Sequence, residues 1–195
     1  SSFLAPPSAT SANGWTFVST TAGRLWHGGD AGVFQLDPIT EVATFANFTG
    51  REMVVGQDPS TGWSLCGHPG PIECWDDLLR VSLSTGTVTG SATVGNGATG
   101  IAVGAGSVWT ANSYVDTVSR VNPATLKVIA TIKVGDGPRD IAYDGRYLWT
   151  ANVVSGTLTK IDPNTNKVVG TVAVGAEPIT IKHVGSYLFV FHQGL

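Results

Sequence analysis

One unit of 40 residues recurs along this chain of 195 residues. A shift of 40 places residues 94–97 on 134–137, and it places Trp-Thr-Ala-Asn at 109–112 on the same four letters at 149–152. A second shift carries the pattern to Phe189. A fixed period of this length is typical of repeat architectures, in which each copy is one supersecondary unit packed on its neighbours. The repeat therefore restricts the chain to a small set of folds.

Each copy contains short runs rich in β-branched and aromatic residues and bounded by turn residues, which is the pattern of β-strands. In the most regular copy, Asp144-Gly145 fits a tight hairpin turn with positive φ, and Asp162-Pro163-Asn164 fits a type I turn. The strands predicted in this copy are called a, b, c and d in chain order, and they span residues 140–143, 147–151, 157–161 and 167–174. Four antiparallel strands in about 40 residues make one propeller blade. The sequence therefore predicts an all-β fold, a β-propeller of four-stranded antiparallel blades, with a β-sandwich or an open solenoid of hairpins as the alternatives.

The blades are unequal in regularity. We expect one propeller domain over 1–195, with four full blades near 13–50, 51–93, 94–133 and 134–173 and a half blade at 174–195. An open last blade would leave strand edges and apolar faces exposed, so the ring must close. The N-terminal segment could complete the last blade, the chain could be a fragment of a larger ring, or a second chain could complete the ring.

Composition narrows the function classes. The net charge is −3 and the 11 Lys and Arg residues are scattered, so no basic face is offered to nucleic acid. No apolar run approaches the roughly 20 residues that a membrane helix needs, so we expect no membrane span. With 25 Gly, 10 Pro and a single Met, the chain is suited to strands and turns.

Three segments carry a family resemblance. Val-Gly-x-Gly-Pro-x-x-Ile-Ala at 134–142, Leu-Trp-Thr-Ala-Asn at 148–152 and the run at 157–169 resemble the YVTN-type β-propeller repeat, whose superfamily includes streptogramin-lyase-like propellers. The latter resemblance implies a metal-assisted elimination served by His and Glu near the channel. None of the glutamates matches that site by motif; they are Glu41, Glu52, Glu73 and Glu177.

Residues that recur once per blade are interpreted as structural. The strand-b aromatic positions are predicted to pack blade against blade, and they are Trp26, Trp109, Trp149 and Phe189. Asn112 and Asn152 are predicted to be turn residues that bond their own backbone. Gly95, Gly135 and Gly175 are predicted to supply a backbone conformation that a side chain would obstruct.

Function is expected where the repeat is broken. His192 stands where other copies have Asn, His183 follows Lys182 where another copy has Ala-Tyr, and His27 and Asp30 follow the first tryptophan. The candidates for catalytic residues are therefore His27, Asp30, His183 and His192, and the candidates for metal ligands are His27 and His192. Propellers gather ligands from several blades at one end of the channel, but unrelated surface histidines, His68 included, would give the same sequence.

The two cysteines lie close together in one segment rich in Gly and Pro. Cys66 and Cys74 are predicted to form a disulfide, which indicates an oxidising compartment and an extracellular or periplasmic location. Two buried free thiols are the alternative.

Two functions follow as hypotheses. The first is a non-catalytic extracellular or periplasmic propeller that serves as a binding or scaffold module for a protein, glycan or surface. The second is a metal-assisted lyase or hydrolase with its site at the channel end. The sequence identifies no cofactor and leaves a divalent metal open.

Overall fold

The computed structural model describes five strands, β1 to β5, by their backbone, and residue 58 and residues 60–66 and 76–193 with side chains. It places eighteen strands and, in these described parts, no helix. The first sheet contains β1 (Thr16–Ser19), β2 (Leu25–Gly29), β3 (Gly32–Leu36) and β4 (Ala43–Phe45). The second contains β5 (Met53–Val55), β6 (Thr61–Leu65), β7 (Asp77–Ser82) and β8 (Thr87–Thr93).

The three remaining sheets follow in chain order. The third contains β9 (Ala98–Gly104), β10 (Ser107–Asn112), β11 (Thr117–Asn122) and β12 (Lys127–Lys133). The fourth contains β13 (Pro138–Tyr143), β14 (Leu148–Asn152), β15 (Thr157–Asp162) and β16 (Lys167–Ala173). The fifth contains β17 (Pro178–Val184) and β18 (Tyr187–His192).

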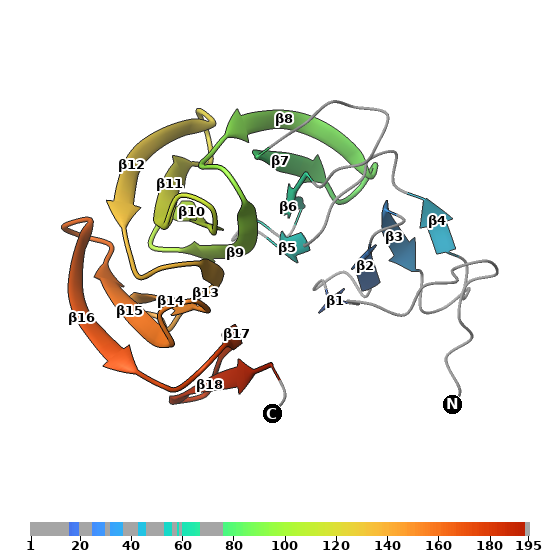
Figure 1. The fold of residues 1–195 in the computed structure, drawn as a ribbon. Helices are drawn as coiled ribbons and strands as arrows, with labels where there is room; N and C mark the ends of the chain where they lie inside the picture. Colours follow the sequence, from blue (N-terminus) through green and yellow to red (C-terminus); the bar gives the residue numbers. More distant parts are fainter. Residues whose placement is uncertain are drawn as a thin grey trace.

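The sheets are arranged as the blades of a propeller. Within each sheet, neighbouring strands pair antiparallel in chain order. The five sheets follow one another in an arc, with β1, β5, β9, β13 and β17 toward its centre (Figure 1). The predicted fold class, an all-β propeller with four-stranded blades and a final half blade, is confirmed.

Burial differs from strand to strand within a blade, and the sequence shows why. All six residues of β10 are buried, because both of its faces are covered by neighbouring blades. The outermost strands carry exposed β-branched residues, such as Val128 and Ile129 on β12 and Val168 and Val169 on β16. These residues suit an extended backbone without needing a core.

The hairpin turns depend on residues that accept positive φ. Gly145 has φ 92° and lies in the turn between β13 and β14, as the Asp144-Gly145 pair predicted. The turn after Asp162 is one residue longer than the predicted type I turn. Asn166 has φ 55°, and its N–H donates to the Asp162 carbonyl at 2.9 Å. Asp162 also accepts from the Asn164 N–H through its side chain.

The core lies between blades, where strand-b tryptophans pack against the next sheet. Trp109 is fully buried with Ile141, Leu148 and Ile161 of the fourth sheet, and Trp149 packs against a cluster that reaches Ile181 of the fifth. The packing prediction is therefore confirmed for Trp109 and Trp149. Phe189 is exposed, and the side chain of Trp26 lies outside the described residues.

The prediction that Asn112 and Asn152 bond their own backbone as turn residues is wrong. Both are fully buried. Asn112 Oδ1 accepts from the Thr110 hydroxyl at 2.9 Å, and Asn112 Nδ2 donates to the hydroxyls of Thr117 and Ser119. Asn152 makes the same three bonds one blade later. A buried amide must satisfy its donors and acceptor, and the hydroxyls of strands b and c do so here.

The reason for two of the recurring glycines also differs from the prediction. A Cβ on Gly95 would lie within 2.9 Å of three side-chain atoms of Asn112, and a Cβ on Gly135 would lie 2.6 Å from Asn152 Nδ2. These glycines leave room for the buried amides. Gly175 has φ 99°, which fits the predicted conformational role.

The cysteine segment connects β6 to β7, which are strands b and c of the second blade. Cys66 is buried directly after β6, and no cysteine in the described part of the chain is a free thiol. Cys74 lies outside the described residues, so the disulfide between them stays a prediction. The described strands and turns also include no helix suited to crossing a bilayer.

Candidate ligand pocket between two blades

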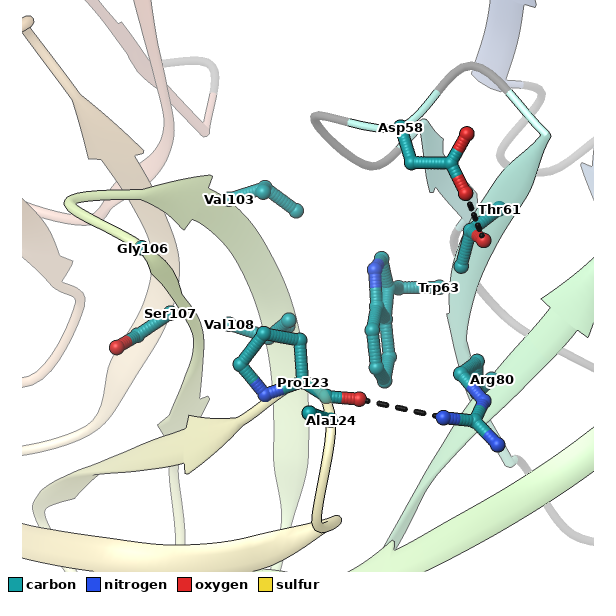
Figure 2. Close-up of a pocket in the computed structure, with 10 residues that line it drawn as sticks. All are labelled: Asp58, Thr61, Trp63, Arg80, Val103, Gly106, Ser107, Val108, Pro123 and Ala124. Atoms are coloured by element: carbon teal, nitrogen blue, oxygen red, sulfur yellow. Dashed lines mark hydrogen bonds between the residues drawn. The ribbon is translucent and has the colours of Figure 1, made fainter.

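A cavity of about 350 Å³ lies between the second and third sheets. We call the contact between these sheets the open joint, and the contact between the third and fourth sheets the filled joint. The second sheet contributes Trp63, Arg80 and the turn before β6, and the third contributes an apolar wall (Figure 2). The lining residues are Asp58, Thr61, Trp63, Arg80, Val103, Gly106, Ser107, Val108, Pro123 and Ala124.

Trp63 is the largest side chain in the pocket. It lies on β6 opposite Arg80 of β7, as Trp109 lies opposite Arg120 and Trp149 lies opposite Lys160. Trp63 is only 2% exposed, yet its indole N–H has no acceptor among the described residues. An unpaired buried donor costs about 1–3 kcal/mol, so this group favours any ligand that brings an acceptor.

The other strand-b tryptophans satisfy the same group. Trp109 Nε1 donates to the Gly104 carbonyl at 3.0 Å. Trp149 Nε1 donates to Asp144 Oδ2 at 2.7 Å. The N–H of Trp63, which has no acceptor among the described residues, therefore differs from that of the tryptophan in the other two blades that can be compared.

Arg80 fixes one side of the pocket and joins the two blades. Its Nη1 donates to the Pro123 carbonyl at 3.3 Å, and its Nε and Nη2 donate to the side chain and carbonyl of Thr89. Arg120 reaches the Pro163 carbonyl of the following blade in the same way, at 2.7 Å. The strand-c arginine is thus a repeated tie between neighbouring blades.

Asp58 lies at the other side of the pocket, in the turn before β6. Its carboxylate accepts from the Ser60 hydroxyl at 2.7 Å, the Ser60 N–H at 3.0 Å and the Thr61 hydroxyl at 2.9 Å. The Ser60 hydroxyl, the Ser60 N–H and the Thr61 hydroxyl lower the pKa of Asp58, so it is a carboxylate at neutral pH. A carboxylate has about four acceptor sites, and three are used, so one remains for a ligand.

The filled joint carries larger side chains at the same positions of the repeat. Tyr143 and Leu148 stand 40 residues after Val103 and Val108, and both pack with Trp109. Tyr143 packs against the core cluster that contains Trp109. The cavity at the open joint is therefore explained by small residues on one wall.

The histidine candidates of the sequence do not converge. His183 pairs with Leu188 and His192 with Pro178, so they lie at opposite ends of the last hairpin, roughly 13 Å apart along the strand. His192 takes the place of the buried asparagine, and its Nδ1 lies 2.6 Å from the Ala176 carbonyl oxygen. Both histidines are exposed.

The N-terminal candidates are not placed as a site. His27 lies on β2 and pairs with Phe17 and Phe34, but its side chain is outside the described residues, as are Asp30 and His68. Among the residues described, no group of three His, Cys, Asp or Glu side chains is arranged to hold a metal ion.

His183 has a neighbour that the sequence did not suggest. Burial raises the pKa of Asp144, but hydrogen bonds from the Tyr147 N–H, the Trp149 indole and the Arg146 N–H outweigh it, and the His183 charge adds to them. The net pKa of Asp144 is below its ordinary value. The carboxylate is used to hold the turn between β13 and β14 and to pair the Trp149 indole.

A second polar cluster joins the fourth and fifth sheets near the centre of the arc. Asp140 is buried on β13, and its Oδ1 accepts from the Ile141 N–H at 2.8 Å. Its Oδ2 accepts from the Ile181 N–H at 2.9 Å and the Lys182 ammonium at 3.3 Å. The arrangement ties two blades, and its acceptors are occupied by protein donors.

Sequence reasoning missed Trp63 and Arg80. Trp63 precedes Trp109 by 46 residues rather than 40, because the cysteine segment lengthens the connection after β6, and the tryptophan therefore lies out of phase with the repeat. Arg80, Arg120 and Lys160 are spaced by 40 residues and so follow the repeat. This recurring cation was the sequence pattern that could have identified Arg80.

Comparisons with known proteins agree with the propeller. The YNCE-like beta-propeller family matches residues 78–190, which is more than half of the chain. No curated protein sequence matches the chain.

Three solved structures are similar in fold. A functionally unknown protein from Desulfotomaculum acetoxidans is 18% identical with a TM-score of 0.71, and the match covers 93% of this chain and 64% of that one. Kuenenia stuttgartiensis hydrazine synthase is 24% identical with a TM-score of 0.59, covering 66% of this chain and 37% of that one. The dihydro-heme d1 dehydrogenase NirN in complex with DHE is 12% identical with a TM-score of 0.62, covering 82% and 37%. The chain thus spans between 37% and 64% of the length of these proteins.

Proposed function

This chain belongs to the YNCE-like β-propeller family, and we propose that it serves as a non-catalytic binding module that holds a small ligand, or one residue of a partner protein or glycan, at the open joint. The observation that carries the proposal is the cavity whose largest side chain, Trp63, is buried with its indole N–H unpaired among the described residues. Ligand pockets are mostly apolar with a few placed polar groups, and this cavity has that character. Arg80 joins the two blades beside the cavity through its bond to the Pro123 carbonyl.

The test uses the indole N–H itself. In the ¹⁵N-labelled full chain, the Trp63 resonance is assigned by its loss in Trp63→Phe. We expect a saturable shift of that resonance with at least one of three probes at millimolar concentration: methyl glucoside, N-acetyltyrosinamide or p-cresol. If none of the three shifts it, the binding proposal is wrong.

The location is a second part of the proposal. We propose an extracellular or periplasmic protein with a Cys66–Cys74 disulfide, supported by the burial of Cys66 directly after β6 and by the short segment between the cysteines. Thiol titration of the denatured, unreduced protein should find no free thiol, and reduction should release two. Two thiols before reduction would contradict it.

A polypeptide partner at the last hairpin is the third part. Tyr187, Phe189 and Phe191 of β18 are 71%, 48% and 52% exposed, and β18 pairs only with β17 in the described fold. An added strand from a second chain would cover this edge by β-augmentation. Mass measurement in solution should find an assembly larger than the single chain; a strictly monomeric, cooperatively unfolding species would contradict it.

A further inference from the structure

The cavity at the open joint lies where the next blade carries a larger side chain at the equivalent position of the repeat. Val103 lines the cavity, and the residue 40 positions later is Tyr143. Tyr143 packs against the cluster around Trp109, and its hydroxyl donates to the Gly145 carbonyl at 2.8 Å. The blade frame therefore accommodates an aromatic ring beside a strand-b tryptophan.

The cavity is large enough for such a ring to come from outside. Its volume is about 350 Å³, and a cavity of about 150 Å³ in a protein core is enough to bind benzene. Val103, Val108 and Pro123 supply an apolar wall suited to a ring. The remaining volume leaves room for the substituent that carries the ring.

Polar groups at one end of Trp63 specify what the ring should carry. In Figure 2 the indole nitrogen is at the end of Trp63 nearer Asp58, whereas Arg80 and Pro123 lie toward the other end. The indole needs an acceptor, and Asp58 has one acceptor site left by Ser60 and Thr61. A hydroxyl accepts and donates at once, while an anionic group would be repelled by the Asp58 carboxylate.

We propose that the open joint binds a phenol-type ring, free or as a tyrosyl side chain, whose hydroxyl accepts from Trp63 Nε1–H and donates to Asp58. This inference rests on the binding function proposed above and names its ligand class. The ring takes the space that corresponds to that of Tyr143 at the filled joint. No covalent step is involved.

The experiment compares matched ligands on the full chain by the shift of the Trp63 indole resonance. We expect p-cresol to bind at least tenfold more tightly than toluene, which lacks the hydroxyl, and than p-toluate, which is anionic. N-acetyltyrosinamide distinguishes the two sources: binding tighter than that of p-cresol indicates a tyrosyl side chain, and weaker binding indicates a free phenol.

Variants test the named contacts. Trp63→Phe and Asp58→Asn should each lower the affinity for p-cresol at least fivefold, measured by calorimetry. The affinity for p-cresol should then be close to the affinity for toluene. Val103→Tyr should abolish binding by supplying the ring from the protein. Trp109→Phe, at the filled joint, is the matched control and should leave p-cresol affinity unchanged.

The outcomes separate this inference from the binding function. If methyl glucoside shifts the Trp63 resonance and p-cresol does not, the phenol inference is overturned and the binding function stands. If toluene binds as tightly as p-cresol, the role of the hydroxyl is overturned. If no probe shifts the resonance, both proposals fail.

Discussion

The open joint and the filled joint are built from the same backbone repeat but differ in their side chains. At the filled joint, Trp109 is fully buried, its N–H is paired and Arg120 lies 4.8 Å from its ring centre. At the open joint, Trp63 is equally buried but its N–H is unpaired among the described residues, and a cavity adjoins it. The difference teaches that a repeat fixes strand pairing and the ties between blades, while single side chains decide whether a joint is solid or hollow.

The largest effect should come from removing the two tryptophans. Trp109→Ala should lower the free energy of unfolding by about 3–5 kcal/mol, because it leaves an enclosed hole in a packed core. Trp63→Ala should cost less, about 3 kcal/mol, because no indole hydrogen bond to the described residues is lost and a cavity is already present. Urea denaturation of both variants measures the two losses. A larger loss of stability in Trp63→Ala than in Trp109→Ala would contradict the difference between the two joints.

The packing of Tyr143 on Gly104 gives the next effect. A Cβ on Gly104 would overlap the Tyr143 ring. Gly104→Ala should therefore cost about 1–3 kcal/mol and Tyr143→Val about 2 kcal/mol. The double variant should be more stable than the sum predicts by at least about 1 kcal/mol, since the smaller side chain makes room for the new methyl. Additive losses would show that the two residues do not compete for one space.

The arginine ties should differ in strength. Arg120 donates to Ser107, Pro163, Asn166 and the Ala105 carbonyl. Arg80 donates to Thr89 and, at 3.3 Å, to the Pro123 carbonyl. Arg120→Met should cost about 2 kcal/mol and Arg80→Met about 1 kcal/mol.

Thermal unfolding of the two arginine variants measures these losses of stability, and Lys160→Met is the matched control in the fourth sheet. The Lys160 ammonium lies 3.8 Å from the centre of the Tyr147 ring. The Lys160→Met variant should therefore lose less than about 1 kcal/mol of stability. Equal losses from all three would contradict the difference between the joints.

The smallest effect is a pH dependence at the filled joint. The Gly137 N–H lowers the pKa of Asp116, and the Lys133 ammonium adds to it. Because the folded pKa lies below the unfolded value of about 3.9, this contribution is complete above that pH and is lost as the pH falls through the folded value. Asp116→Asn should flatten the acid side of the stability curve, measured as urea midpoints between neutral pH and about pH 2. An unchanged acid slope would contradict it.

Much of the fold could be predicted because strands and turns depend on local sequence. The predicted strand at 157–161 is β15, Thr157–Asp162, and the predicted strand at 167–174 is β16, Lys167–Ala173. Gly145 and Pro163 mark turns through their own backbone preferences. These features need no knowledge of distant residues.

The site could not be predicted in the same way. Trp63 lies out of phase with the other strand-b tryptophans, so its equivalence to Trp109 becomes visible only through the pairing of Trp63 with Arg80. The buried roles of Asn112 and Asn152 were also missed, because the hydroxyls that bond them lie on two strands that meet only in the folded blade. The search for irregular histidines led instead to exposed positions on the last hairpin.

The sequence by itself determined that this protein repeats a four-stranded antiparallel unit, since periodic β-branched runs and turn residues act within each copy. Only the tertiary structure decided where neighbouring copies leave space. A cavity between blades depends on the combined volumes of side chains from two sheets. The small Val103 leaves a cavity beside Trp63, whereas the larger Tyr143 packs against the cluster that contains Trp109. That difference is a property of pairs of residues brought together by folding.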